Sequence, residues 1–416
     1  MVKPTISRRG FSKLMGVGAA YAVVAGGVRA SVPASLRASM PASMSELPAE
    51  ARAALASVVR LSSNENPYGP SQAALKAMTD GFSLAWRYPD EHADLLVEEL
   101  ARMNAVPAEQ ILLGDGSGEI LKLAAAAFTN HDKKIVLANP TFEAIGRHAS
   151  VARAEVVKID LTSSYGHDLG KMLAAANGAG SVTSSTNGAG AADSGAAAAD
   201  NRATSADSAG LVYICNPNNP TASITPKNEL AEFLAKVSPA TTVLVDEAYH
   251  HYVESNDYES LIPLVKQYPN LIVARTFSKI YGMAGLRCGY CVTQRANIER
   301  MRTHQTWDSV NIMALVAALA SLKDPEQVNR GRKLNSEVKK SVCSELDALG
   351  YRYIPSHANF MMIDLRREVR PIISALRTRG VEVGRPFPAL PNHLRVTIGT
   401  APEMKAFLSA FREVMV

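Results

Sequence analysis

The sequence has almost no net charge outside its first thirty residues. Of its 44 basic residues, five lie in that segment, which has no acidic residue, and the other 39 balance 39 acidic residues. A protein that binds nucleic acid usually has a strongly basic surface, so the charge does not indicate a nucleic-acid partner. At 416 residues the chain is long enough to bury a full core and to form two or three domains.

Cysteine is also scarce. The chain contains only Cys215, Cys288, Cys291 and Cys343. Cys288 and Cys291 have a spacing typical of metal or redox sites, but they lie in an apolar pattern typical of a strand, where side chains three residues apart point to opposite faces. We therefore expect neither a metal nor a disulfide at this pair. His250 and His251 lack a second pair of ligands, so we expect no metal there either.

A long apolar run is absent from the N-terminus, where a basic segment precedes a mildly apolar one. Arg8 and Arg9 are followed by a Gly- and Ala-rich run from Leu14 to Val28 and an A-x-A-like site ending at Ala30. This arrangement resembles a twin-arginine export signal. We expect residues 1–30 to be a signal peptide recognised by the twin-arginine machinery, and the mature protein to be periplasmic or otherwise exported. The alternatives are a cytoplasmic protein with a basic tail and an uncleaved anchor, for which the apolar run is short.

Two segments lack the apolar residues of a folded core. Residues 31–44 are rich in Ala, Ser and Pro, and residues 177–209 consist almost wholly of Gly, Ala, Ser, Thr, Asn and Asp. Such segments cannot bury enough apolar surface to offset the entropy lost on ordering. We expect residues 31–60 to form a leader and arm, with a short helix from Glu50 to Val59, and residues 177–209 to form a flexible surface insertion.

Three apolar runs end in polar residues typical of an active site. They are Leu211 to Cys215, which leads to Asn219, Val243 to Val245, which leads to Asp246, and Leu271 to Thr276, which leads to Lys279. We expect each run to be a buried strand, and ligands of open α/β sheets bind at the carboxyl ends of strands. A lysine desolvated at such a place can act as an amine nucleophile. Lys279 is therefore the expected catalytic centre.

The motifs at these strand ends resemble those of a known enzyme family. They are Asn216-Pro217-Asn218-Asn219-Pro220-Thr221, Asp246-Glu247-Ala248-Tyr249, Thr276-Phe277-Ser278-Lys279 and Ala284-Gly285-Leu286-Arg287-Cys288-Gly289. In this order they resemble the fold type I (class I/II) aminotransferases that use pyridoxal 5'-phosphate (PLP), most closely the histidinol-phosphate aminotransferase branch. The resemblance extends from about Leu61 to Gly399. It implies an α/β fold with a mostly parallel sheet in a large domain, residues 61–300, and a smaller α/β domain, residues 301–416.

The resemblance implies a role for each polar residue at the strand ends. Lys279 would carry PLP as an internal aldimine and move the proton at the substrate Cα, and Asp246 would keep the pyridine nitrogen protonated. Asn219 and Tyr249 match the residues that contact the ring oxygen. Phe142 matches the aromatic side chain that stacks on the ring, where the family usually has tyrosine.

The cofactor phosphate would lie at a Gly-rich turn. Ser117 and Gly118 follow an expected strand and begin a helix, whose N–H groups and dipole attract an anion. The resemblance adds Ser278 and Arg287 on the phosphate. It also implies a homodimer with shared active sites, because Tyr88 matches the tyrosine that reaches the cofactor phosphate of the neighbouring subunit.

Three further residues match substrate-binding positions of the family. Arg395 matches the arginine that holds the substrate carboxylate, to which a guanidinium donates two parallel hydrogen bonds. Arg385 matches a second arginine at the distal end of the substrate, and Asn64 lies in the Asn-Glu-Asn-Pro segment at the mouth of the site. The implied reaction transfers an amino group between an amino acid or amino-alcohol phosphate (histidinol-phosphate-like, aromatic or acidic) and a 2-oxo acid such as 2-oxoglutarate.

Two other functions stay open on the sequence alone. A PLP-dependent lyase or decarboxylase could use the same fold and the same arginine, and a protein could bind PLP as a sensor without catalysis. The histidinol-phosphate branch usually has an aromatic residue in the segment that closes over the substrate, whereas residues 45–60 have none. This difference and the expected export weaken the case for histidinol phosphate as the physiological substrate.

Overall fold

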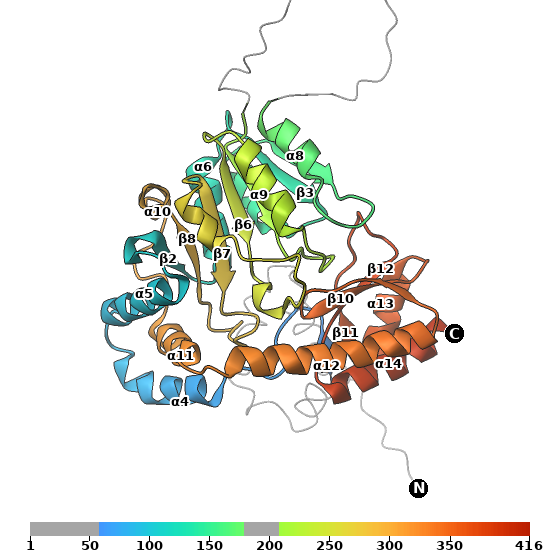
Figure 1. Ribbon diagram of the computed structural model, residues 1–416. Coiled ribbons are helices and arrows are strands. Elements are labelled where there is room, and N and C mark those ends of the chain that lie inside the picture. Colours follow the sequence, from blue (N-terminus) through green and yellow to red (C-terminus); the bar gives the residue numbers. More distant parts are fainter. Residues whose placement is uncertain (1–57, 179–207) are drawn as a thin grey trace, which may run out of the picture. The chain divides into compact units, whose positions relative to one another are not determined.

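The computed structural model describes residues 58–178 and 208–416 of the chain (Figure 1). The expected signal peptide, the leader and most of the expected insertion lie outside these residues. The part from Val59 to Val416 forms one compact unit. Within the described ranges, no helix has both the length and the apolar character needed to cross a membrane.

A seven-stranded sheet lies at the centre of this unit, in the order β2-β8-β7-β6-β5-β3-β4. Its strands are β2 (Ile111–Gly114), β3 (Ile135–Asn139), β4 (Val156–Asp160), β5 (Leu211–Cys215), β6 (Thr242–Asp246), β7 (Leu271–Thr276) and β8 (Gly289–Thr293). β8 runs antiparallel to both of its neighbours, and the other neighbouring strands are parallel. The predicted α/β class with a mostly parallel sheet is confirmed.

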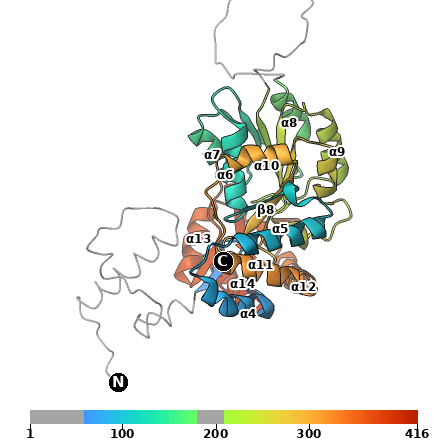
Figure 2. The same cartoon turned by 90° about the vertical axis from the view of Figure 1, so that its left-hand side faces the viewer.

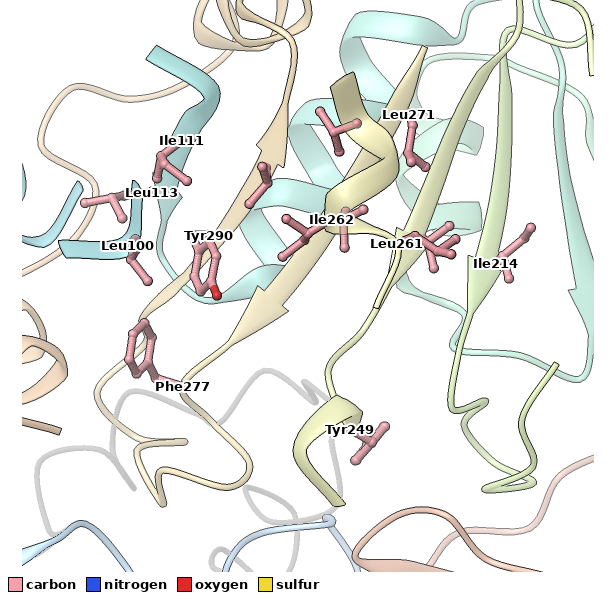
Figure 3. Packing of buried hydrophobic residues seen from close by; sticks show 14 of the residues in the cluster. Leu100, Ile111, Leu113, Ile214, Tyr249, Leu261, Ile262, Leu271, Phe277 and Tyr290 are labelled. Carbon is pink, nitrogen blue, oxygen red and sulfur yellow. The ribbon is translucent and has the colours of Figure 1, made fainter. Parts of the chain in front are cut away.

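The strands are apolar on both faces because helices cover both faces. Leu211, Tyr213 and Cys215 of β5 point to one face, whereas Val212 and Ile214 point to the other. The helices on the first face are α6 (Ser117–Phe128), α7 (Ala144–Val151) and α10 (Arg295–Arg302). Those on the second face are α5 (Asp90–Asn104), α8 (Leu169–Ala176), α9 (Lys227–Lys236) and α11 (Ile312–Leu322). Figure 2 shows α6 and α7 on one side of the sheet and α8 and α9 on the other, and Figure 3 shows the packing on the second face.

The closely spaced cysteines follow the same alternation. Cys288 packs in the core of the second face and Cys291 in the core of the first. Both are free and buried. Cys288 directly precedes β8, and the two side chains point to opposite faces of the sheet, as predicted.

A smaller core lies in the C-terminal part of the chain. Its antiparallel sheet has the order β12-β10-β9, formed by β12 (His393–Thr397), β10 (Phe360–Asp364) and β9 (Arg352–Ile354). The helices that supply apolar side chains to this core are α12 (Gln327–Ala348), α13 (Val369–Thr378) and α14 (Ala401–Met415). Figure 1 shows α12 running from the region of α11 toward this small sheet. The domain boundary near residue 300 stays a prediction.

The first described strand joins this C-terminal core. β1 (Val59–Leu61) pairs in parallel with β11 (Val381–Val383), and Leu61 is buried in the core. The prediction that a helix extends from Glu50 to Val59 is therefore wrong at Val59, which lies in a strand. Pairing with a distant strand overrides the local helix propensity there. The segment then leads into α4 (Gln72–Gly81), which is capped by Ser71 and packs against α11.

Candidate active site

Neighbouring parallel strands bring three of the predicted polar residues to one edge of the sheet. β5, β6 and β7 lie side by side with the same direction. Asp246 ends β6, while Asn219 and Lys279 follow β5 and β7 within a few residues. The structure therefore joins the three strand ends into one site, as the sequence predicts.

Lys279 lies in an environment that disfavours its positive charge. Its Nζ donates hydrogen bonds to the backbone carbonyls of Asn64, at 3.0 Å, and Ser63, at 3.4 Å. The same atom lies 5.6 Å from the centre of the Tyr249 ring. Burial, and after it the charge of Arg395, lowers the pKa of Lys279 to about 8. More of this amine is therefore neutral and nucleophilic near neutral pH than in an exposed lysine.

Asp246 is a buried carboxylate with one hydrogen bond to each oxygen. Oδ1 accepts from the Ala248 N–H at 3.1 Å, and Oδ2 accepts from the Tyr213 hydroxyl at 2.9 Å. Burial raises the pKa of Asp246 to about 6, while the two hydrogen bonds and the charge of Lys279 act in the opposite direction. Tyr213 was not among the residues predicted for the site, because the sequence shows it only as one apolar position of a strand.

Arg395 is a partly buried cation that lacks an acidic partner in the described part of the chain. Its Nη1 donates to Oδ1 of Asn219 at 2.8 Å, and its Nη2 donates to the Ser62 carbonyl at 2.7 Å. Its Nε is buried without a partner. Burial lowers the pKa of Arg395 to about 10. Since a buried charge without a counter-charge is unfavourable, an anion is the group that this arginine lacks.

Asn64 connects the N-terminal segment to the segment after β6 and to β12. Its Nδ2 donates to the Tyr249 hydroxyl at 3.0 Å, and its N–H donates to Oγ1 of Thr397 at 2.9 Å. Asn64 has a φ of 54°, a left-handed conformation that asparagine tolerates better than most residues. The amide of Asn359, which the sequence analysis missed, donates to the Asn64 carbonyl at 3.1 Å. Tyr249 lies beyond the carboxyl ends of the strands (Figure 3), and burial raises its pKa.

The predicted phosphate residues surround one turn. α6 begins at Ser117 and Gly118 without a side-chain cap, so its first N–H groups can bind an anion. Arg287 Nη1 lies 3.4 Å from Oγ of Ser278, to which it donates. Gly116 has a φ of +73°, and a Cβ there would lie 2.3 Å from Arg287 Nη2. Glycine therefore allows the guanidinium to approach the turn, and the residues fit a phosphate.

Three predicted residues lie outside these contacts. Phe142 is 40% exposed, and Tyr88 is 80% exposed on the surface. Arg385 Nη2 forms an ion pair with Oε1 of Glu143 at 3.0 Å, and its guanidinium lies 4.3 Å from the centre of the Phe387 ring. Glu143 directly follows Phe142, the predicted stacking residue. It thus forms an ion pair with the arginine that was expected to bind the distal end of the substrate.

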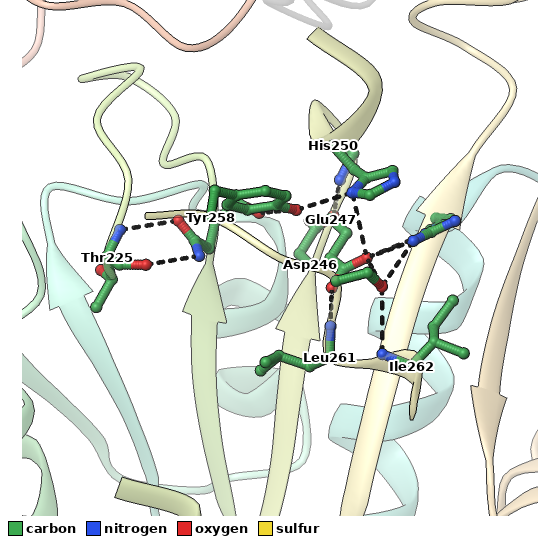
Figure 4. Close-up of polar contacts among 11 residues, drawn as sticks. Thr225, Asp246, Glu247, His250, Tyr258, Leu261 and Ile262 are labelled. Carbon is green, nitrogen blue, oxygen red and sulfur yellow. Dashed lines mark hydrogen bonds and ion pairs between the residues drawn. The ribbon is translucent and has the colours of Figure 1, made fainter. Parts of the chain in front are cut away.

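A buried ion pair lies directly behind Asp246. The Nε and Nη2 of Arg275 donate to Oε2 of Glu247 at 3.0 and 2.9 Å, and the Leu261 N–H donates to Oε1 at 2.7 Å (Figure 4). His250 lies in the same network, 3.3 Å from the Tyr258 hydroxyl, and burial lowers its pKa to about 3. Sequence analysis missed this network because it depends on the register of β6 and β7.

No cluster of three or more His, Cys, Asp or Glu side chains suited to a metal ion occurs among residues 58–178 and 208–416. His250 and His251 pack edge to face, with ring centres 4.9 Å apart. Burial lowers the pKa of His251, as it does that of its neighbour. His250 is therefore hydrogen-bonded in the network behind the site, and His251 packs against it.

Comparison with known proteins identifies the family. Residues 56–411 match the family model described as "Aminotransferase class I and II". The histidinol-phosphate aminotransferase of Moorella thermoacetica is 37% identical over 361 residues, or 86% of this chain and 86% of that protein. Histidinol-phosphate aminotransferase 2 of Pseudomonas fluorescens is 35% identical over 89% of this chain and 93% of that protein.

Solved structures show the same fold. The histidinol-phosphate aminotransferase of Sinorhizobium meliloti, in complex with pyridoxal-5'-phosphate, superposes with a TM-score of 0.76 at 22% identity, over 94% of this chain and 99% of that one. The family match covers most of the sequence, and the partly buried lysine, the buried carboxylate and the uncapped turn at α6 fit the cofactor. The chain therefore belongs to the class I and II aminotransferases, and it is a fold type I transaminase that uses pyridoxal 5'-phosphate as its cofactor.

Proposed function

We propose that Lys279 binds PLP covalently and then moves the proton at the substrate Cα. When bound, PLP supplies an electron sink for the charge that develops at that carbon. Asp246 holds the proton on the ring nitrogen, and Asn219 and Tyr249 contact the ring oxygen. The lowered pKa of the Lys279 amine and its proximity to the buried carboxylate of Asp246 support these roles.

The first turn of α6 would hold the phosphate of PLP. Ser117 and Gly118 would contribute N–H groups there, and Ser278 and Arg287 would contribute side chains. The uncapped helix end and the position of the guanidinium over the turn support this arrangement. Phe142 would stack on the cofactor ring. Its side chain is partly exposed and is therefore available for this contact.

Arg395 carries the functional proposal, because it is a partly buried cation whose buried Nε has no partner. We assign it to the carboxylate of the amino acid and of the 2-oxo acid, since a carboxylate accepts two parallel hydrogen bonds from a guanidinium. The contact from Arg395 to Asn219 at 2.8 Å supports a carboxylate site beside the proposed cofactor ring. Arg385 binds the distal end of the substrate, and Asn64 lines the entrance.

The proposed reaction is transfer of an amino group to a 2-oxo acid such as 2-oxoglutarate. The donor is an amino acid or an amino-alcohol phosphate of histidinol-phosphate-like, aromatic or acidic character. The names of the curated relatives support the first of these classes. The absence of an aromatic residue in residues 45–60 argues for a wider choice of donors.

Reconstitution of the cofactor-free protein with PLP tests the proposal. The wild type is expected to gain the visible absorbance of lysine-bound PLP and to lose it with a subset of amino acids. A 2-oxo acid then restores the absorbance and yields a new amino acid, whereas Lys279→Ala shows none of these changes. Release of carbon dioxide, or of pyruvate with ammonia, would instead support the decarboxylase or lyase alternative. A band that no amino acid discharges contradicts the proposal.

We further propose a homodimer in which Tyr88 reaches the site of the partner subunit. Phe82, Trp86 and Tyr88 expose more than half of their surfaces within a short segment, and clustered exposed aromatic residues are typical of an interaction surface. Light scattering is expected to give the mass of a dimer. Mixing Tyr88→Ala with Lys279→Ala protomers is expected to restore activity, because one hybrid site then has both residues. Failure to regain activity refutes the shared site.

We also propose export through the twin-arginine machinery. The support is the Arg8-Arg9 pair and the apolar run after it, which lie outside the described residues. Fractionation of cells that express the full chain is expected to place the protein in the periplasm with an N-terminus near Ser31. Replacement of both arginines by lysine is expected to retain the protein in the cytoplasm, and unchanged export excludes this route.

A further inference from the structure

Tyr213 makes a buried hydrogen bond to the carboxylate proposed to face the cofactor ring. Its hydroxyl donates to Oδ2 of Asp246 at 2.9 Å. The two residues are 0% and 3% exposed, so water cannot easily replace either partner. A buried hydroxyl of this kind is a fixed donor and not an adaptable surface contact.

The register of the sheet produces this contact. Tyr213 of β5 lies opposite Leu244 of β6, and Cys215 lies opposite Asp246. Because side chains alternate along a strand, Tyr213 and Asp246 lie on the same face as diagonal neighbours, a distance that a long aromatic side chain can span. The remaining contact of the carboxylate is the Ala248 N–H on Oδ1. Each oxygen therefore has one donor and a further lone pair for another partner.

We propose that Tyr213 is a positioning residue that keeps Asp246 ionised and thereby holds the proton on the ring nitrogen of PLP. This inference rests on the proposed function, which assigns Asp246 to that nitrogen. A donor to the charged form of a carboxylate stabilises that form and makes the carboxylate a weaker base. The proton that Asp246 and the ring nitrogen share then stays on the nitrogen, where it strengthens the electron sink.

The other groups around Asp246 are consistent with this role. Burial raises the pKa of Asp246, and the Tyr213 hydroxyl is the largest of the contributions that lower it. The Ala248 N–H and the charge of Lys279 lower it further, whereas Glu247 raises it. Burial also raises the pKa of Tyr213, so its hydroxyl keeps the proton that it donates. Cys215 stays a neutral thiol for the same reason.

Tyr213→Phe tests the inference because it removes one oxygen atom and keeps the ring in the core. The readout is the ¹⁵N chemical shift of the ring nitrogen in holoenzyme reconstituted with ¹⁵N-labelled PLP, followed between about pH 6 and pH 8. The wild type is expected to show a protonated nitrogen throughout. In Tyr213→Phe the shift is expected to move toward the unprotonated value across this whole pH range, because the proton moves from the nitrogen to the more basic carboxylate, with weaker PLP binding and a fall in kcat of about tenfold, as for loss of a hydrogen bond to a charged group.

Two further variants separate the possible outcomes. Tyr252→Phe changes another buried tyrosine, which makes no hydrogen bond to Asp246, and is expected to keep the wild-type shift. Asp246→Asn is expected to abolish the protonated signal. If Asp246→Asn leaves the signal unchanged, the proposed role of Asp246 fails. If Asp246→Asn abolishes it while Tyr213→Phe keeps the wild-type shift, Asp246 retains its role and the inference about Tyr213 is overturned.

Discussion

Lys279 is expected to destabilise the cofactor-free protein at neutral pH. Burial, followed by repulsion from Arg395, lowers its pKa from 10.5 to about 8. Because the unfolded chain holds this proton more tightly than the folded one, the buried charge lowers the free energy of unfolding by about 3 kcal/mol. This penalty is present in full below about pH 8 and disappears as the pH rises toward 10.5, the ordinary value.

Replacement of Lys279 by methionine removes the charge and keeps an unbranched side chain. The variant gains the 3 kcal/mol but loses a hydrogen bond to the Asn64 carbonyl, which is worth about 1 kcal/mol. We therefore expect Lys279→Met to raise the free energy of unfolding of the cofactor-free protein by about 2 kcal/mol at pH 7. Toward pH 10 this advantage is expected to vanish, although the variant is inactive at every pH.

Urea denaturation at pH 7 and pH 10 measures both effects. Wild type and variant are compared at equal protein concentration, because association would also change the apparent stability. Lys405→Met, at an exposed lysine of α14, is the matched control and is expected to behave as the wild type at both pH values. If the difference between wild type and Lys279→Met is the same at pH 7 and pH 10, Lys279 does not hold a disfavoured charge and the reasoning is refuted.

Three further predictions concern charged residues in and around the site. Arg395→Lys keeps the charge but loses the paired hydrogen bonds, so KM for amino acids is expected to rise by about tenfold or more with a smaller change in kcat; an unchanged KM in steady-state assays places the carboxylate elsewhere. Glu143→Gln frees Arg385 from its exposed ion pair, so kcat/KM is expected to rise about two- to fivefold for donors with an acidic or phosphate-bearing side chain. An equal gain for neutral donors would argue against that explanation. Glu247→Gln breaks the buried pair with Arg275 and is expected to lower the free energy of unfolding by about 3 kcal/mol; a loss near zero in urea denaturation contradicts a buried pair.

Much of the site could be predicted because its residues follow buried strands directly. The predicted runs Leu211 to Cys215 and Leu271 to Thr276 coincide with β5 and β7. Apolar runs of this length can be recognised locally, and the polar residue after each run lies at the ligand-binding edge of a parallel sheet. The assignment of Arg395 and Asn64 depended on family resemblance instead, since no local pattern connects them with Lys279.

Other parts of the site could not be predicted because they depend on contacts between distant segments. Glu143 and Arg385 meet although their flanking sequences give no indication of a pair. Asn359 lies at the start of a C-terminal strand and reaches the backbone of Asn64. In both cases the partner is chosen by how the C-terminal sheet packs against the loops of the large sheet.

The types of the main elements and the polar residues at the strand ends follow from the local pattern, because the spacing of apolar and polar residues along the chain specifies both. Long-range packing is needed to explain why Val59 joins a strand, why Tyr213 reaches Asp246, and why Glu247 pairs with Arg275. These contacts follow from strand order and register, which burial of the whole core sets and which no local stretch of sequence encodes.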